Sequence, residues 1–419
     1  MRPVHKLTAP IIISTLLYDV DALSLAVPPK WHSRRSAAPV MDLGLDVELV
    51  GKSAAGLAAF AIAFRTGAAF AVVDQPRLPS LSATYRHVGV RYTNAGGARV
   101  KVFYPASSPG DEAPAPYCTD GRETSDGMAG LVGFRQLGLS FLLAHLADAR
   151  SGTWLDAPPA PTAEDKPPPI LVYSHGFGGN MDMASYLMRT FAAHGIIVAA
   201  VEHTDGTASF TKLGNGSPLP FSPGKLKRRD QLETRAAELL AASQPGALGL
   251  PPSLAGGDVF LGGHSYGGPS ALLAAAAAAR DANVPLRGVV LHDPALGMGE
   301  EVWAIRRAAS RPDAPTISYV SDEYDKYGVR CGEATFHTVG GFHGNFVDAP
   351  LWAPKWVMAP LSFVIPAAGP CDAEAMHDML ARTAKLFMNA ASERGEAPTE
   401  EILGASRWRR DGRPLLELR

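Results

Sequence analysis

The chain has 419 residues, of which 46% are hydrophobic, and a formal net charge of −2 at pH 7. This composition is ordinary for a globular protein with a sizeable core, and the small net charge excludes the broad basic field that favours a nucleic-acid partner. The three cysteines, Cys118, Cys331 and Cys371, lie far apart without a CxxC pair. They argue against a disulfide scaffold or a structural zinc site, while a single bridge stays open.

Residues 1–80 differ in composition from the rest and are expected to form a targeting or leader region. An apolar run at 7–18 follows basic residues, as in a secretory signal, and the basic, acid-poor stretch 28–40 resembles an organelle transit peptide. A second apolar run, 54–73, is about long enough to span a membrane but contains Arg65. A low-complexity leader without a membrane role is the alternative. The sequence thus indicates secretory, endomembrane or organelle targeting without selecting among them.

Residues 81–395 carry the pattern of one α/β domain, and residues 396–419 are expected to be a charged tail. Two strand-like segments flank the hairpin sequence Asn-Ala-Gly-Gly at 94–97. Apolar strands with a helix between them form a βαβ unit, which predicts a parallel sheet. The strands are expected at 85–92, 99–104, 169–174, 196–202, 258–261, 286–292, 316–320 and 334–339, and helices at 184–194, 230–243 and 373–391 and after 268.

Two connecting segments are unusual. Residues 128–147 predict a helix whose apolar surface is wider than an amphipathic stripe, which indicates either contact with lipid or a substrate chain, or packing on two sides. Residues 204–227 form a long loop, and a loop of this length in a compact domain is usually functional or mobile.

The hexapeptide Gly-His-Ser-Tyr-Gly-Gly at 263–268 lies between a predicted strand and a predicted helix. In that context a Gly-x-Ser-x-Gly sequence predicts a nucleophile elbow, a turn so tight that only glycine tolerates the close approach on either side. A small-residue turn without catalysis is the plainer interpretation of the same pattern. Residues beyond the elbow decide between the two.

An acyl-transfer serine needs a base and an orienting acid, because a free hydroxyl is a poor nucleophile at neutral pH. Asp293 follows the next strand and His343 the last, in the order Ser, Asp, His of α/β-hydrolases. The sequence therefore predicts Ser265 as nucleophile, His343 as general base and acid, and Asp293 as the orienting acid. Asp322 and Glu323, which also follow a strand, stay open as rival acids.

The developing oxyanion needs two backbone donors. We expect one from the N–H of Tyr266, the residue after the nucleophile, and the other from Phe177 in the sequence His-Gly-Phe-Gly-Gly at 175–179. An ordinary glycine-rich turn is the alternative for that loop. No dinucleotide fingerprint, P-loop, metal-binding histidine pair or EF-hand loop is present, so no cofactor or metal is expected. The predicted fold class is α/β, an α/β-hydrolase fold with a mostly parallel central sheet and helices on both faces.

Several segments together resemble the platelet-activating factor acetylhydrolase family, the plasma and intracellular type-II enzymes. They are Tyr-Ser-His-Gly-Phe-Gly at 173–178, His-Gly-Ile-Ile-Val-Ala-Ala-Val-Glu-His at 194–203, the elbow, Leu-His-Asp-Pro at 291–294, Ser-Asp-Glu-Tyr at 321–324 and Phe-His-Gly-Asn-Phe-Val-Asp at 342–348. The chain departs from the family at Tyr266, where phenylalanine is expected, and in the loop 204–227.

The resemblance implies a calcium-independent phospholipase of the A2 type that releases short or oxidised acyl groups from the sn-2 position of phospholipids. It also implies that the helix expected at 128–147 could be an interfacial surface. The residues alone support ester hydrolysis only. A related esterase of the dienelactone-hydrolase or polyester-hydrolase kind, acting on non-lipid esters, remains an alternative, as does a membrane-associated binding protein without turnover. Oligomeric state is left open.

Overall fold

The computed structural model describes residues 83–110, 113–136, 138–161, 166–280, 284–296, 314–353, 369–406 and 416–419. The predicted leader, with both of its apolar runs, lies outside these residues. Within the described residues no helix is long and apolar enough to cross a membrane.

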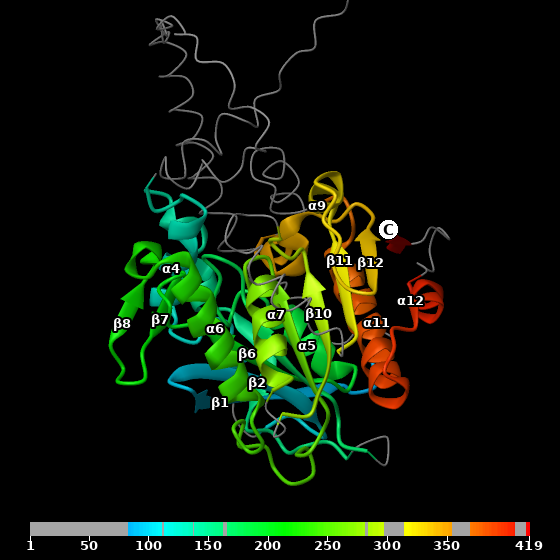
Figure 1. Cartoon of the computed structure of the whole chain (residues 1–419). Helices are drawn as coiled ribbons and strands as arrows, with labels where there is room; N and C mark the ends of the chain where they lie inside the picture. The colour runs from blue at the N-terminus through cyan, green and yellow to red at the C-terminus, as the bar shows by residue number, and fades with distance from the viewer. Residues whose placement is uncertain are drawn as a thin grey trace, which may run out of the picture.

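An eleven-stranded sheet organises the described residues, in the order β13-β12-β11-β10-β9-β5-β6-β2-β1-β4-β3 (Figure 1). The central run from β6 through β5, β9, β10 and β11 to β12 is parallel, and antiparallel pairs lie toward both edges. The strands are β1 (His87–Ala95), β2 (Ala98–Ala106), β3 (Pro114–Pro116), β4 (Arg150–Leu155), β5 (Ile170–Ser174), β6 (Ile197–Glu202), β9 (Val259–His264), β10 (Leu286–His292), β11 (Thr316–Val320), β12 (Ala334–Thr338) and β13 (Leu416–Leu418). A separate hairpin pairs β7 (Phe210–Lys212) with β8 (Pro218–Pro220).

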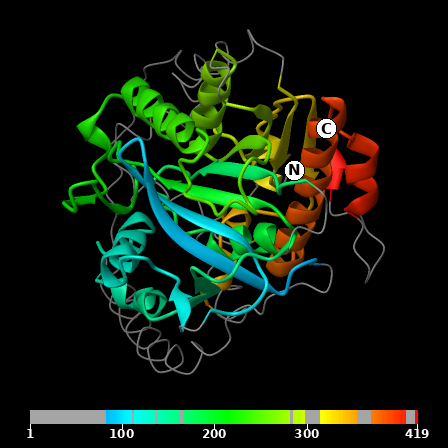
Figure 2. The ribbon, with the colours of Figure 1, turned by 90° about the horizontal axis from the view of Figure 1, so that it is seen from below.

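Helices cover both faces of this sheet (Figure 2). The layer on one face is α5 (Ser185–Ala193) and α11 (Ala373–Arg394), and the layer on the other is α6 (Arg228–Ser243) and α7 (Gly267–Ala278). The remaining helical segments are α4 (Arg122–Leu131), η2 (Ser140–Leu142), η3 (Ala144–Ala147), η4 (Pro223–Lys225), α9 (Asp322–Lys326), η5 (His343–Phe346), η6 (Ala349–Leu351) and α12 (Thr399–Ala405).

Strand β5 shows why the sequence folds this way. Leu171 and Tyr173 pack with α5 and α11, whereas Ile170 and Val172 pack with α6 and α7. Successive side chains of a strand point to opposite faces, so a strand covered on both faces must be apolar at every position. The two helix layers and the parallel centre confirm the predicted α/β-hydrolase fold.

The prediction of one helix over residues 128–147 is wrong. Helix α4 ends at Leu131, and the chain then passes through Gly133 and Gly138 at φ of 78° and 69° before the short η2 and η3 turns. These left-handed glycine conformations interrupt a helix. Leu143 and Leu146 are buried in a cluster with Met128, which favours the packing interpretation over contact with lipid.

Two other segments contain more structure than the sequence indicated. The loop 204–227 holds the β7–β8 hairpin, which projects beside α4 and α6 in Figure 1. Residues 396–419, predicted as a charged tail, contain α12 and β13, and β13 pairs with β12.

Candidate active site

Ser265 lies in the tight turn between β9 and α7. Its φ is 54°, a left-handed conformation that a non-glycine residue seldom adopts. A Cβ on Gly263 would lie 2.2 Å from the carbonyl oxygen of Gly267, and a Cβ on Gly267 would lie 2.1 Å from the carbonyl oxygen of Ser174. The turn therefore has no room for a side chain at position 263 or 267, two residues to either side of the serine, which is the geometry expected of a nucleophile elbow.

Asp293 and His343 meet at the carboxyl ends of the strands, where Ser265 also lies. Asp293 follows β10, is fully buried and has a φ of 42°. Its Oδ2 lies 2.9 Å from Nδ1 of His343, and its Oδ1 accepts a hydrogen bond of 2.7 Å from the N–H of Ser321. The His343 ring lies beside the elbow, with its centroid 4.3 Å from that of the His264 ring, one residue before Ser265. Asp293 and His343 are thus in contact at the carboxyl ends of parallel strands, and the His343 ring lies against the residue that precedes Ser265.

The two rival acids have other partners. Asp322 Oδ1 lies 2.7 Å from Nε2 of His337 and accepts from the N–H of Gly340 at 3.1 Å. Glu323 Oε2 accepts from the backbone N–H of His343 at 2.8 Å. Among the described residues, Asp293 is the carboxylate that contacts a ring nitrogen of His343. This geometry favours Asp293 as the orienting acid.

The loop of residues 175–179 passes directly over the elbow. A Cβ on Gly176 would lie 3.1 Å from Cβ of Ser265, and the rings of Phe177 and Tyr266 meet edge to face at 5.7 Å. The loop is fixed by Gly178, whose N–H donates to the carbonyl of Thr207 at 2.7 Å. Within the described part of the chain the N–H of Phe177 donates to no protein acceptor. The two predicted oxyanion donors therefore belong to segments that pack against each other beside the serine.

Arg235, on α6, is a buried support for both of these segments, and it is not among the site residues predicted from the sequence. Its side chain is fully buried; Nε lies 2.8 Å from Oδ2 of Asp205, and Nη1 donates to the carbonyl of His175 at 2.6 Å. Its guanidinium also lies 5.0 Å from the centre of the Tyr266 ring, within the range of a cation–π contact. The signal was present, since Arg235 falls on the apolar stripe of α6 at helical spacing from Leu232 and Leu239.

A second buried pair supports the start of the loop. Nδ1 of His203 lies 2.7 Å from Oε2 of Glu238, and Nε2 lies 2.7 Å from the hydroxyl of Ser174, the last residue of β5. Burial raises the pKa of Glu238 to about 7, and burial, followed by the nearby charge of Arg235, lowers the pKa of His203 well below its ordinary value. The imidazole of His203 is therefore neutral and serves as a hydrogen-bonded brace.

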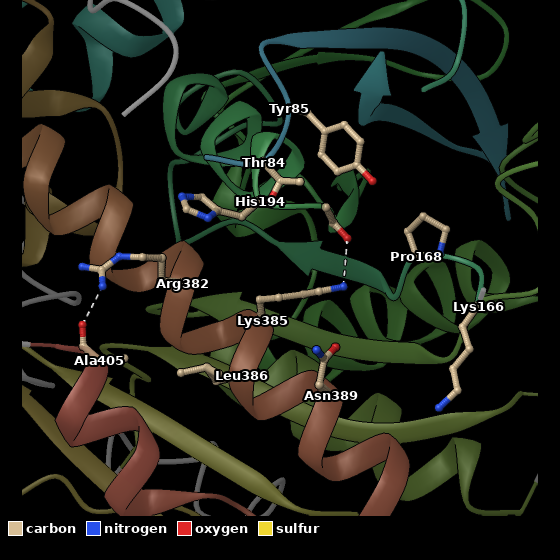
Figure 3. Close-up of a pocket in the computed structure, with 11 residues that line it drawn as sticks. Thr84, Tyr85, Lys166, Pro168, His194, Arg382, Lys385, Leu386, Asn389 and Ala405 are labelled. Carbon is tan, nitrogen blue, oxygen red and sulfur yellow. Dashed lines mark hydrogen bonds between the residues drawn. The ribbon is translucent and has the colours of Figure 1, made fainter. Parts of the chain in front are cut away.

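A pocket of about 320 Å³ lies at the other ends of the strands, away from Ser265 (Figure 3). Its walls include Pro168, just before β5, and Gly195, just before β6, so it lies at the amino ends of the strands. Lys385 and Arg382 of α11 also line it, and Lys385 Nζ donates to the carbonyl of Gly195 at 3.4 Å. This pocket is separate from the site at Ser265.

Comparison with known proteins points to one family. The family model of platelet-activating factor acetylhydrolase, isoform II, matches residues 73–235. The platelet-activating factor acetylhydrolase of Canis lupus familiaris is 28% identical over 193 residues, covering 41% of this chain and 41% of that protein. The Bos taurus protein is 38% identical over 85 residues, covering 17% of this chain and 19% of its own length. These matches span less than half the length of the curated relatives.

A solved structure agrees on the fold. The ferulic acid esterase from Streptomyces cinnamoneus superposes with a TM-score of 0.56 at 19% identity, over 81% of this chain and 98% of that one. At this identity the likeness shows the fold alone. The family match covers the 175–179 loop and Arg235 and ends before Ser265. The chain is thus similar to platelet-activating factor acetylhydrolases over residues 73–235, and its fold is that of the α/β-hydrolases.

Proposed function

We propose that this protein is a serine-type carboxylic ester hydrolase with Ser265 as nucleophile, His343 as base and Asp293 as orienting acid. The observation that carries the proposal is the 2.9 Å contact between Asp293 and His343 beside an elbow whose serine has a φ of 54°. Such strained serines cluster at functional sites. A glycine-rich turn used only for packing has no need of an imidazole held by a buried carboxylate.

The mechanism follows from the contacts. Because Nδ1 of His343 faces Asp293, its Nε2 takes the proton as the Ser265 hydroxyl attacks the ester carbonyl. The oxyanion forms beside the N–H groups of Phe177 and Tyr266. His343 then gives its proton to the leaving alcohol, and water, activated by the same imidazole, hydrolyses the acyl-enzyme and regenerates the serine.

We further propose that the substrate is a phospholipid with a short or oxidised acyl chain at the sn-2 position. This part rests on the similarity to platelet-activating factor acetylhydrolases over residues 73–235 and on the motifs at 173–178, 194–203 and 342–348. Hydrolysis proceeds without calcium in this proposal. Within the described residues, no group of three or more His, Cys, Asp or Glu side chains is arranged to hold a metal ion.

A fluorophosphonate probe tests the serine mechanism without a known substrate. The wild type should be labelled, Ser265→Ala should not, and Ser217→Ala, a change at an exposed residue of the β7–β8 connection, should be labelled like the wild type. Absence of label on the wild type, or equal labelling of Ser265→Ala, would overturn the catalytic proposal and leave a binding protein.

A substrate panel tests the lipid assignment. Initial rates are measured with a 1-alkyl-2-acetyl glycerophosphocholine, its long-chain sn-2 analogue and 4-nitrophenyl acetate, each with EDTA and with added calcium. We expect the short-chain phospholipid to turn over fastest, at a rate unaffected by EDTA. Turnover of the aryl ester alone would reject the phospholipid and favour a non-lipid esterase.

The identity of the acid has its own test. Asp293→Asn should lower kcat about 10⁴-fold, because the imidazole loses the group that fixes its tautomer. Asp322→Asn is the matched control on the neighbouring strand end, since its contacts are with His337 and Gly340. Near-wild-type kcat in Asp293→Asn with loss in Asp322→Asn would transfer the role to Asp322.

A further inference from the structure

Helix α9, a single turn after β11, contacts the acid–base pair at three points. The N–H of Ser321, its N-cap, donates to Asp293, and the carboxylate of Glu323 accepts from the backbone N–H of His343. The ring of Tyr324 stacks on the His343 ring, with centroids 4.9 Å apart and planes 1° from parallel. One short segment therefore touches the carboxylate, the backbone and the imidazole of the candidate site.

The imidazole needs such support because His343 lies on η5, a short turn that holds its side chain only weakly. His343 begins a four-residue 3₁₀ turn, and its side chain is 30% exposed. The hydrogen bond to Asp293 fixes the position of one ring nitrogen but does less to fix the tilt of the ring plane. A flat aromatic ring against the imidazole face restricts this rotation, and the His264 ring, 4.3 Å away, gives a second buried contact.

A side-chain hydrogen bond also joins Tyr324 to Ser265. Burial raises the pKa of Tyr324, the negative charge of Asp293 raises it further, and a hydrogen bond with Ser265 opposes these effects in part. The phenol is consequently neutral and remains a hydrogen-bond donor beside the Ser265 hydroxyl. Its backbone is fixed as well, since the N–H of Tyr324 donates to the Ser321 hydroxyl at 3.3 Å.

We propose that Tyr324 is a positioning residue of the reaction centre: its ring holds the imidazole of His343 in plane with Asp293, and its phenol O–H orients the Ser265 hydroxyl. Glu323 secures this arrangement by tying α9 to the His343 backbone. The inference rests on the proposed function of Ser265 and His343 and adds to it a residue that takes part in no bond making or breaking. Tyr324 acts by keeping nucleophile and base aligned before the substrate binds.

The test is the rate constant of fluorophosphonate labelling, which reports activation of Ser265 by His343 and requires no substrate. Tyr324→Leu removes both ring and hydroxyl and should slow labelling about 10²-fold, the cost of a misplacement of about 1 Å. Tyr324→Phe keeps the stacked ring and should recover most of that loss, remaining within about tenfold of the wild type, as expected for one hydrogen bond. Tyr327→Leu is the matched control, because Tyr327 is the C-cap of α9 and is 81% exposed; it should be labelled at the wild-type rate.

A second measurement separates positioning from a general structural role. On a soluble aryl ester, Tyr324→Phe and Tyr324→Leu should lower kcat in the order of their labelling rates while KM stays within about twofold. Labelling of Tyr324→Leu at the wild-type rate would overturn the inference and leave the proposed function intact. Equal losses in Tyr324→Phe, Tyr324→Leu and Tyr327→Leu, with a lowered Tm in all three, would also overturn it. A wild type that takes no label would overturn the proposed function and the inference with it.

Discussion

Replacing Arg235 with methionine should lower the free energy of unfolding and remove the contacts of Arg235 with the 175–179 loop and the Tyr266 ring. The Arg235 and Asp205 side chains form a salt bridge of 2.8 Å in which both are 0% exposed. Methionine fills much of the arginine volume but leaves the Asp205 carboxylate buried without its cation. Breaking a buried pair by removing one partner costs about 3–5 kcal/mol, and the carbonyl of His175 loses a donor in the same change. We therefore expect the free energy of unfolding to fall by about 3–5 kcal/mol.

Urea denaturation of wild type and variant, followed by circular dichroism, measures this loss. The double variant Arg235→Met/Asp205→Asn should regain a large part of it, because no uncompensated charge is left buried. Arg229→Met is the control on the same helix: Arg229 forms an exposed pair with Glu233 and should leave the unfolding midpoint unchanged.

The pH dependence sharpens the prediction. In the wild type burial acts to raise the pKa of Asp205, but the charge of Arg235 and hydrogen bonds from Thr207 outweigh it and the pKa is lowered. Its stabilising contribution is therefore present above the unfolded pKa of about 3.9 and is lost as the pH falls through the folded value. Without Arg235 burial prevails, the pKa rises and Asp205 takes a proton, so the deficit of Arg235→Met should shrink between pH 7 and pH 5. A loss below about 1 kcal/mol, or a double variant no more stable than the single one, would refute the reasoning.

Two more predictions concern the same edge of the sheet. Gly267→Ala should prevent accumulation of folded protein or abolish labelling of Ser265, because its Cβ would lie 2.1 Å from the carbonyl oxygen of Ser174. Gly404→Ala is the control, because a Cβ there meets no atom within 4 Å. Equal yields and melting temperatures for the two variants would contradict the steric argument. Glu238→Gln should gain stability relative to wild type as the pH rises. Since the folded pKa of Glu238 is about 7 and its unfolded value is about 4.3, burying this carboxyl disfavours ionisation, and wild-type stability is lost across that window by about 3 kcal/mol. Urea titrations at pH 4.5, 6 and 7.5 measure the difference, and parallel pH curves for the two proteins would reject the assignment.

The central strands could be predicted from the sequence because burial on both faces leaves a continuous apolar run. The bounds predicted for β10 and β11, 286–292 and 316–320, are those observed. The single helix predicted over 128–147 does not form, because Gly133 and Gly138 lie between its leucines and adopt positive φ. The three-residue strand β13 was not predicted, because it lies in a segment of charged composition. Its pairing with β12 is a long-range contact that no local sequence pattern encodes.

Some residues of the candidate site were predicted from the sequence and others were not. Ser265, Asp293 and His343 were predictable because each follows the end of a strand, and parallel strands end at one edge. The roles assigned to these residues stay predictions. Arg235 and Tyr324 were not predicted, because their contacts depend on which helices and turns meet in three dimensions. The helical spacing of Arg235 from Leu232 and Leu239 indicates that it is buried but not which groups it contacts, and the stacking of the Tyr324 ring on His343 has no signature at fixed spacing in the sequence.

Strand β13 has a consequence for how the protein meets other chains. Residues Leu416–Leu418 pair antiparallel with β12, and the following Arg419 extends the contact through Nη2, which lies 2.8 Å from Nδ1 of His337. Without this cover β12 would present a bare row of N–H and C=O groups, the template on which strands of separate molecules pair. A cover of three residues opens more readily than a long strand. Brief fraying of β13 would therefore expose the unpaired backbone groups of β12, two strands from the strand that carries Asp293, to strands of other molecules.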